Sequence, residues 1–190
     1  MKTLRIVTAI VIVAGLGLTG RATYLHAKAD LAGILIWRAW DETRKTGESH
    51  APWAGADFRP AARLQIPRLK YDELVLDNAA ARTLAFGPGL MGNGVRPGQR
   101  GNLVVAGHRT SWFRPLERIA VGDQVELEWF EGREKRKREY EVEKIAVVPP
   151  DEVELLQAGE ADELTMVTCY PFGYGARSPE RFVVKAKVRK

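Results

Sequence analysis

Hydrophobic residues follow three different patterns along the 190-residue chain, and each pattern predicts a different kind of structure. Residues 6–20 (IVTAIVIVAGLGLTG) form one continuous stretch without a charged side chain. Residues 30–48 place apolar side chains at helical spacing, and from residue 61 onward short runs alternate between apolar and polar positions. These patterns predict an apolar N-terminal helix, an amphipathic helix and a β-rich domain.

The uncharged N-terminal stretch predicts a membrane anchor. A spanning helix needs about 20 apolar residues, and residues 22–25 extend the stretch past Arg21, whose long side chain can reach the headgroups. A cleaved signal peptide is the alternative, because Ala27 and Ala29 offer small residues for cleavage. Both interpretations place the rest of the chain outside the cytoplasm, since the basic flank stays inside. We expect residues 1–25 to be retained as a single-pass anchor.

Residues 26–60 are predicted to hold an amphipathic helix followed by a linker. Asp30 is expected to cap the start of the helix and Gly47 to end it. The helix is expected either to pack on the domain or to lie along a membrane surface. Its apolar face is predicted to consist of Leu31, Ile34, Leu35, Trp37 and Trp40. The basic residues of its last turn would be Arg44 and Lys45.

Residues 61–190 are predicted to form an all-β domain. Strand-like runs are ARLQIPRL, ELVLDNA, GNLVVAGH, QVELEWF, REYEVEKIAVV, ELTMVTCY and RFVVKAKV. Turn sequences such as GPGLMGNG and RPGQRGN separate some of them, and EVELLQ (152–157) is compatible with a short helix. So many short strands favour a closed barrel or a sandwich. In a barrel, strand ends from distant parts of the chain meet at the rim.

Charge and composition exclude several classes of function. The net charge is +5, and the densest basic segment is GREKRKRE (132–139). It lies between two strand-like runs, so it is predicted to be a solvent-exposed hairpin tip and not a site for nucleic acid or lipid headgroups. The sequence has no Gly-rich phosphate loop and no zinc-spaced Cys/His cluster. No cofactor, metal or nucleic-acid partner is expected.

Cys169 is the only cysteine, and it stands at the end of a strand-like run. In an exported protein, such a thiol is either reactive or buried and inert. Thiolate chemistry requires a nearby base or cation and a donor for the oxyanion that forms during attack. Of the three histidines, His26 and His50 lie in the predicted helices and linker. His108 follows the run NLVVAG and is therefore the candidate base.

Arg181 is the candidate oxyanion donor, because it opens the last strand-like run directly after the loop that leaves Cys169. A guanidinium can donate two hydrogen bonds to a carbonyl or to an oxyanion. Arg177 and Arg109 are the alternatives. Three residues could orient the imidazole, and no motif selects among them: Asn78, Asn102 and Asp123.

Together these features resemble the sortase family. The shared features are a hydrophobic anchor, an all-β domain, AGH after one strand, TC after another and an arginine at the start of the next. The segment LTMVTCYPF resembles the sortase T-x-T-C segment. The runs RAWDET, LAFGPGL, GNLVVAGHRTSWF and VTCYPF resemble the sortases of Gram-negative bacteria, and the resemblance covers nearly the whole chain.

The resemblance implies a sortase-like closed β-barrel of about eight strands with short helices, preceded by a transmembrane helix and an amphipathic helix. It implies that Cys169 is the nucleophile, His108 the general acid/base and Arg181 the stabiliser of the substrate carbonyl. Thr168 and Tyr170, which flank the sulfur in sequence, are the expected substrate-binding residues.

The resemblance also implies a substrate and a location. The substrate would be an exported protein with a C-terminal LPXTG-like signal, cleaved between Thr and Gly through a thioester to Cys169 and transferred to an amine acceptor. The location would be the inner membrane, with the catalytic domain in the periplasm. Two alternatives stay open: a hydrolytic thiol peptidase that uses the same residues, and a membrane-tethered β-domain with an inert cysteine.

Overall fold

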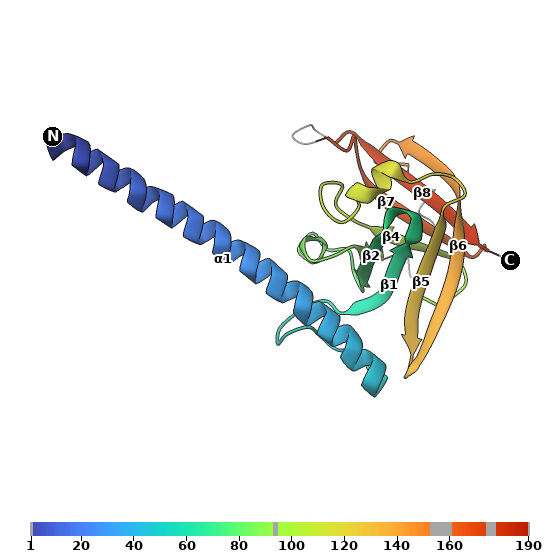
Figure 1. Cartoon of the computed structure of the whole chain (residues 1–190). Coiled ribbons are helices and arrows are strands. Elements are labelled where there is room, and N and C mark those ends of the chain that lie inside the picture. Colours follow the sequence, from blue (N-terminus) through green and yellow to red (C-terminus); the bar gives the residue numbers. More distant parts are fainter. Residues whose placement is uncertain (1, 93–94, 153–160, 174–177, 190) are drawn as a thin grey trace.

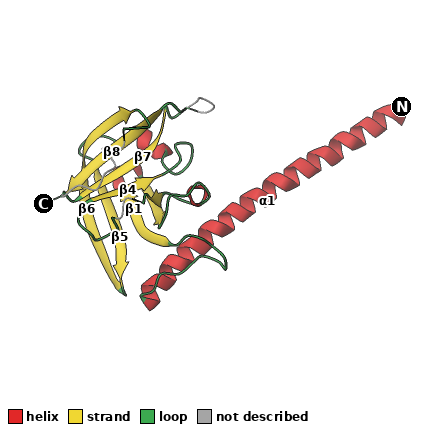
Figure 2. Ribbon diagram, turned by 180° about the vertical axis from the view of Figure 1, so that it is seen from behind, coloured by secondary structure: helices red, strands yellow, loops and turns green. Residues whose placement is uncertain are grey.

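The computed structural model describes residues 2–92, 95–152, 161–173 and 178–189, which form a β-barrel and one long helix (Figure 1 and Figure 2). The strands are β1 (Pro60–Ile66), β2 (Tyr71–Leu76), β3 (Gly89–Leu90), β4 (Asn102–Ala106), β5 (Gln124–Glu131), β6 (Glu134–Val148), β7 (Glu163–Tyr170) and β8 (Glu180–Val188). The helices are α1 (Lys2–Thr46) and the short 3₁₀ segments η1 (Pro67–Leu69), η2 (Thr83–Ala85) and η3 (Arg114–Arg118).

The eight strands close into a barrel in the order β1-β2-β3-β4-β7-β8-β6-β5. The pairs β2–β3 and β4–β7 are parallel, and the other described pairs are antiparallel. The predicted all-β closed barrel of about eight strands is therefore confirmed. The two-residue strand β3 lies in a segment predicted as a turn, and residues 153–157 of the proposed short helix lie outside the described residues.

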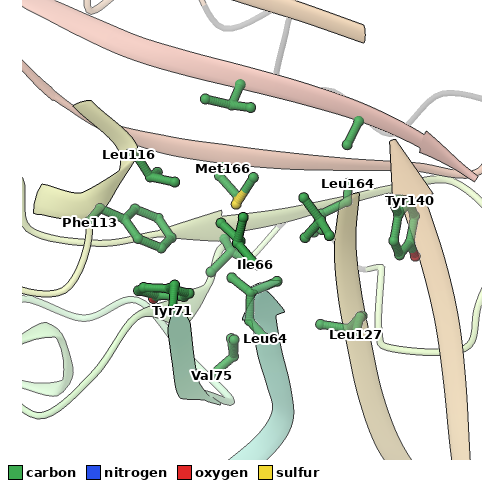
Figure 3. Close-up of a cluster of buried hydrophobic side chains, with 14 of the residues drawn as sticks. Leu64, Ile66, Tyr71, Val75, Phe113, Leu116, Leu127, Tyr140, Leu164 and Met166 are labelled. Atoms are coloured by element: carbon green, nitrogen blue, oxygen red, sulfur yellow. The ribbon is translucent and has the colours of Figure 1, made fainter. Parts of the chain in front are cut away.

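Alternating side chains fill the barrel interior. Along β1 every second residue is buried, and Leu64 and Ile66 are fully covered. Figure 3 shows these two side chains beside Leu127 of β5 and Met166 of β7, so distant segments contribute to one core. Because successive side chains of a strand point to opposite faces, the alternation in the sequence sets which residues enter this core.

The helix α1 begins earlier and packs differently from the prediction. It runs without interruption from Lys2 to Thr46, so Asp30 lies inside it and the prediction of an N-cap there is wrong. Its end is as predicted: Gly47 has a φ of 82° and donates its N–H to the carbonyl of Thr43 at 2.8 Å. Within the described part of the chain, no helix combines the length and apolar character that crossing a bilayer requires.

The face of α1 that meets the barrel matches the prediction only in part: Trp40 is buried as predicted, but most of the other predicted residues are not. The buried residues are Ala32, Ile36, Ala39, Trp40 and Thr43, whereas Leu31, Ile34 and Trp37 are exposed. Ile36 and Trp40 pack into a cluster with Phe58, and the small alanines allow close approach of the helix. Apolar residues surround this part of α1, so their spacing alone does not select the packed face.

The basic segment forms the predicted hairpin tip. β5 and β6 pair from Gln124↔Glu141 to Glu131↔Glu134, and acidic side chains neutralise the basic ones. Lys135 lies 2.9 Å from Glu128, and Lys137 lies 2.8 Å from Glu126. The tip also supports α1, as the rings of Trp40 and Phe130 are 4.5 Å apart between centroids.

Candidate active site

The strand register brings three distant residues to one edge of the barrel, which we call the site edge: the edge where β4 and β7 end and β8 begins (Figure 1). β4 and β7 are parallel with Ala106 opposite Val167, so His108 and Cys169 each stand two residues beyond a paired position. β7 and β8 are antiparallel, and Cys169 lies directly opposite Arg181. The topology therefore gathers the predicted nucleophile, base and oxyanion donor.

One cavity of about 330 Å³, the site cavity, contacts all three residues. Its lining residues are Leu84, Met91, Ala106, Gly107, His108, Pro150, Val167, Thr168, Cys169 and Arg181. Cys169 is a free, half-buried thiol, and His108 is exposed. A sulfur that is neither sealed in the core nor fully exposed can meet a peptide carbonyl that enters the cavity.

Arg181 is anchored through the backbone. Its Nη1 donates to the carbonyl oxygens of Glu180 at 3.1 Å and Ser178 at 3.4 Å. Among the described residues it forms no salt bridge with a carboxylate. Because a guanidinium has five N–H donors, these two contacts leave donors available for a ligand in the site cavity.

The loop that carries His108 is fixed to β7 by two hydrogen bonds of Gly107, which also packs closely against Phe113. A Cβ atom on Gly107 would lie 2.8 Å from ring atoms of Phe113, so a larger residue would displace that ring. The N–H of Gly107 donates to the carbonyl of Val167 at 3.2 Å, and the hydroxyl of Thr168 donates to the carbonyl of Gly107 at 2.7 Å. The backbone on the N-terminal side of His108 is therefore held against β7.

The two predicted substrate-binding residues lie in different environments. Thr168 lines the site cavity, but it is only 3% exposed and its hydroxyl is already bonded to Gly107. Tyr170 is absent from the lining of the site cavity and stacks on Phe182 with ring centroids 6.2 Å apart. A direct substrate contact by either residue stays a prediction.

The three candidates for orienting the imidazole each have other partners. Asn102 accepts a hydrogen bond from the hydroxyl of Thr165 at 2.7 Å. Asn78 accepts one from Thr83 at 2.7 Å. Asp123 binds Arg68, which holds the pKa of its carboxyl below the usual value. None of the three lines the site cavity.

Sequence reasoning missed the apolar wall of the site cavity. Leu84, Met91 and Pro150 come from three connecting segments, and no motif pairs them with Cys169. Trp112 donates its indole N–H to the carbonyl of Leu84 at 3.0 Å, which ties η2 to the loop after His108. The runs LAFGPGL and AGHRTSWF were the available signal, because they contain both ends of this contact.

Arg177 and Arg109 were the alternative candidates for the oxyanion donor. Arg177 lies outside the described residues. Arg109 does not line the site cavity, and its Nη1 donates instead to the carbonyl of Pro171.

Across the described ranges, no group of three or more imidazole, thiol or carboxylate side chains is arranged to hold a metal ion.

Comparisons with known proteins identify a family. Residues 64–189 match the family model of the sortase domain. Sortase D of Bacillus subtilis (strain 168) is 29% identical over 138 residues, which cover 70% of this chain and 68% of that protein.

Solved structures share the fold. A Clostridium perfringens Sortase D5 transpeptidase superposes with a TM-score of 0.68 at 20% identity, over 85% of this chain and 99% of that chain. Streptococcus agalactiae sortase C1, in complex with MTSET, gives 0.60 at 28% identity, over 68% and 69% of the two chains. These relatives come from Gram-positive bacteria, so they support the family but not the expected closeness to the sortases of Gram-negative bacteria.

Proposed function

Because the chain belongs to the sortase domain family, we propose that it is a cysteine transpeptidase with Cys169 as its nucleophile. The observation that carries the proposal is the convergence of Cys169, His108 and Arg181 on one cavity. They come from three segments of the chain, and the pairing of β4, β7 and β8 explains why they meet.

The proposed reaction proceeds through a thioester. The thiolate of Cys169 attacks the peptide carbonyl, and the protonated ring of His108 gives its proton to the departing amine as the C–N bond breaks. An incoming amine then attacks the thioester and forms a new amide bond. His108 takes the proton of that amine, and the thiolate of Cys169 is regenerated.

Arg181 is proposed to stabilise the charge that develops on the carbonyl oxygen. Its position opposite Cys169 in the β7–β8 register supports this role. Its two backbone contacts hold the guanidinium in place while other N–H groups remain for the oxyanion. Donors that are fixed before the reaction cost no reorganisation when the charge appears.

The proposed substrate is an exported protein with an LPXTG-like signal, cleaved between Thr and Gly. The apolar wall formed by Leu84, Met91 and Pro150 supports a substrate with an apolar side chain upstream of the scissile bond. The amine acceptor is a second substrate, which replaces the released C-terminal peptide.

We further propose that the protein is anchored in the inner membrane and faces the periplasm, as in the Gram-negative sortases that its motifs resemble. This part rests on the sequence: residues 6–20 carry no charge, and two basic residues precede them. Fractionation of cells that express the full chain, with protease treatment of intact spheroplasts, tests it. A domain that stays in the soluble fraction, or that is protected inside spheroplasts, would contradict it.

Ligation tests the function itself. The full chain is incubated with a labelled peptide that contains an LPXTG-like sequence and with triglycine, and the products are identified by mass spectrometry. We expect a product in which the new amine is joined to Thr. Cleavage without ligation would indicate a hydrolytic peptidase, and an unchanged peptide across a panel of such signals would contradict the proposal.

A further inference from the structure

We propose that Arg109 is a positioning residue, which fixes the loop that carries His108 against the loop that follows Cys169. The inference rests on the proposed function and deepens it, because it concerns how the two reacting groups are held together. The relevant contact is the hydrogen bond from Nη1 of Arg109 to the carbonyl oxygen of Pro171. This contact joins segments 62 residues apart in sequence.

The contact completes a bracket around the reacting pair. On one side, Gly107 is bonded to Val167 and to Thr168 through its N–H and its carbonyl. On the other side, Arg109 is bonded to Pro171. His108 is the single residue between Gly107 and Arg109. On the other segment, Cys169 lies between Thr168 and Pro171. The two segments that carry the ring and the sulfur are therefore tied to each other on both sides of His108.

Exposure explains why such a bracket is needed. His108 is exposed, whereas Arg109 is half-buried. The backbone carbonyl of His108 accepts an N–H from Phe113 at 3.0 Å, which orders the turn within its own loop. That bond does not connect the turn to β7. Arg109 supplies a connection across the two loops on the C-terminal side of His108.

The position of Arg109 distinguishes it from a substrate-binding residue. It does not line the site cavity, and its guanidinium is directed to a backbone carbonyl. Loss of the contact is therefore expected to change the geometry of the Cys169–His108 pair and to leave substrate binding nearly intact. A displacement of about 1 Å can cost on the order of 100-fold in rate, so kcat should fall while KM changes little.

The test measures the reactivity of Cys169 without any peptide. Because Cys169 is the only cysteine, alkylation of the full chain by iodoacetamide reports on this sulfur alone. The alkylation rate is measured against pH in the unaltered protein and in Arg109→Met, Arg109→Lys and His108→Ala. Arg118→Met is the matched control, because Arg118 is an exposed arginine on the neighbouring segment η3.

We expect His108→Ala to change the pH profile of alkylation, and Arg109→Met to move most of the way toward that profile. Arg109→Lys should fall between, since an ammonium can reach one carbonyl but lacks the fixed direction of a guanidinium. Arg118→Met should match the unaltered protein. In the peptide assay, Arg109→Met should lower kcat by about 10- to 100-fold with KM changed less than about threefold.

A profile and a kcat of Arg109→Met within about twofold of the unaltered protein would overturn the inference, even if its melting temperature falls. If Arg109→Met does not fold, Arg109→Lys decides in the same way. An unchanged profile in His108→Ala would overturn the pairing of His108 with Cys169, and with it any role for Arg109. A failure to find a cleaved peptide concerns only the substrate, because the alkylation measurement needs none.

Discussion

The strand β7 passes through two different regions within four residues. Met166 lies in the barrel interior, where it is fully buried among Leu64, Ile66 and other apolar side chains (Figure 3). Cys169 lies at the site edge, half-buried beside a cavity. The interior is ordered by packing in all directions, whereas the site edge depends in addition on a few hydrogen bonds that tie the loop after β4 to β7 and to the loop after β7.

This difference separates stability from reactivity. Packing density makes the interior sensitive to the loss of any methylene group, and the same change at an open edge leaves a gap that water can fill. At the site edge, hydrogen bonds such as that from Thr168 to Gly107 fix distances that packing does not. We therefore expect substitutions in the interior to lower the free energy of unfolding and those at the site edge to lower the reaction rate.

The largest effect is expected for Cys169→Ala. It should abolish both cleavage and ligation of the labelled peptide, because no other thiol is present. The melting temperature should change little, since one half-buried sulfur is removed. Chromatography of the reaction mixture and a thermal melt measure the two quantities. Residual ligation by this variant would contradict the proposed role of Cys169 as the nucleophile.

The converse is expected for Met166→Ala in the interior. The free energy of unfolding should fall by about 2–5 kcal/mol, while kcat per folded molecule should stay within about twofold. Urea unfolding and an assay corrected for the folded fraction measure this. Met91→Ala is the matched control at the site cavity, and it should raise KM with a smaller loss of stability. Equal losses of unfolding free energy in the two variants would contradict the difference between the barrel interior and the site edge.

Arg181→Lys should lower kcat/KM by about 100-fold or more, the scale for loss of one oxyanion donor. A lysine keeps the charge, but its single ammonium cannot both bind the backbone carbonyls and direct further N–H groups to the substrate. Steady-state kinetics measure the loss, and thermal melting checks the fold. A rate near that of the unaltered protein would reassign the stabilising role.

The smallest effect is expected far from the site, at the ion pair of Asp123 with Arg68. The Arg68 guanidinium, and to a lesser extent the N–H of Ala120, hold the pKa of the Asp123 carboxyl below its ordinary value. The unfolded chain therefore binds the proton first, and this stabilisation is present above about pH 4 and lost as pH falls through the lowered pKa. Asp123 is buried but the Arg68 side chain is about half exposed, so solvent screens the pair and keeps the effect small.

Urea unfolding of the unaltered protein and of Asp123→Asn at several pH values tests this contribution. The difference in unfolding free energy between the two proteins should be largest near neutral pH and should shrink below about pH 4. The reaction rate should not change at neutral pH. A difference that is constant with pH would contradict the assigned ion pair.

Much of the fold was predictable because strand alternation reflects burial directly. β1 is an example: each residue of the run from Ala62 to Ile66 alternates between inside and outside as its sequence indicates. The strand β3 was not predictable, since two residues have no periodicity and Gly89 pairs through its backbone with Leu76 and Ala106. The packed face of α1 was predicted only in part, because exposed Ile34 is as apolar as buried Ile36.

The candidate site likewise has features that the sequence predicts and features that it does not. Cys169 was predicted as a site residue because it is unique, and Arg181 because it opens the strand-like run that follows. The contact of Arg109 with Pro171 and the cavity wall at Met91 depend on how loops meet after folding. Such contacts leave no spacing rule in a single sequence, so only the tertiary structure assigns them a place.

The central claim is that the sulfur of Cys169 carries the acyl group, and intact-protein mass spectrometry tests it most directly. The full chain is mixed with an LPXTG-like peptide without an amine acceptor, quenched in acid, and digested to locate any adduct. We expect a mass increase equal to the peptide fragment ending in Thr, located on Cys169 and released by added amine. An adduct on another residue, or none in a sample that cleaves the peptide, would contradict it.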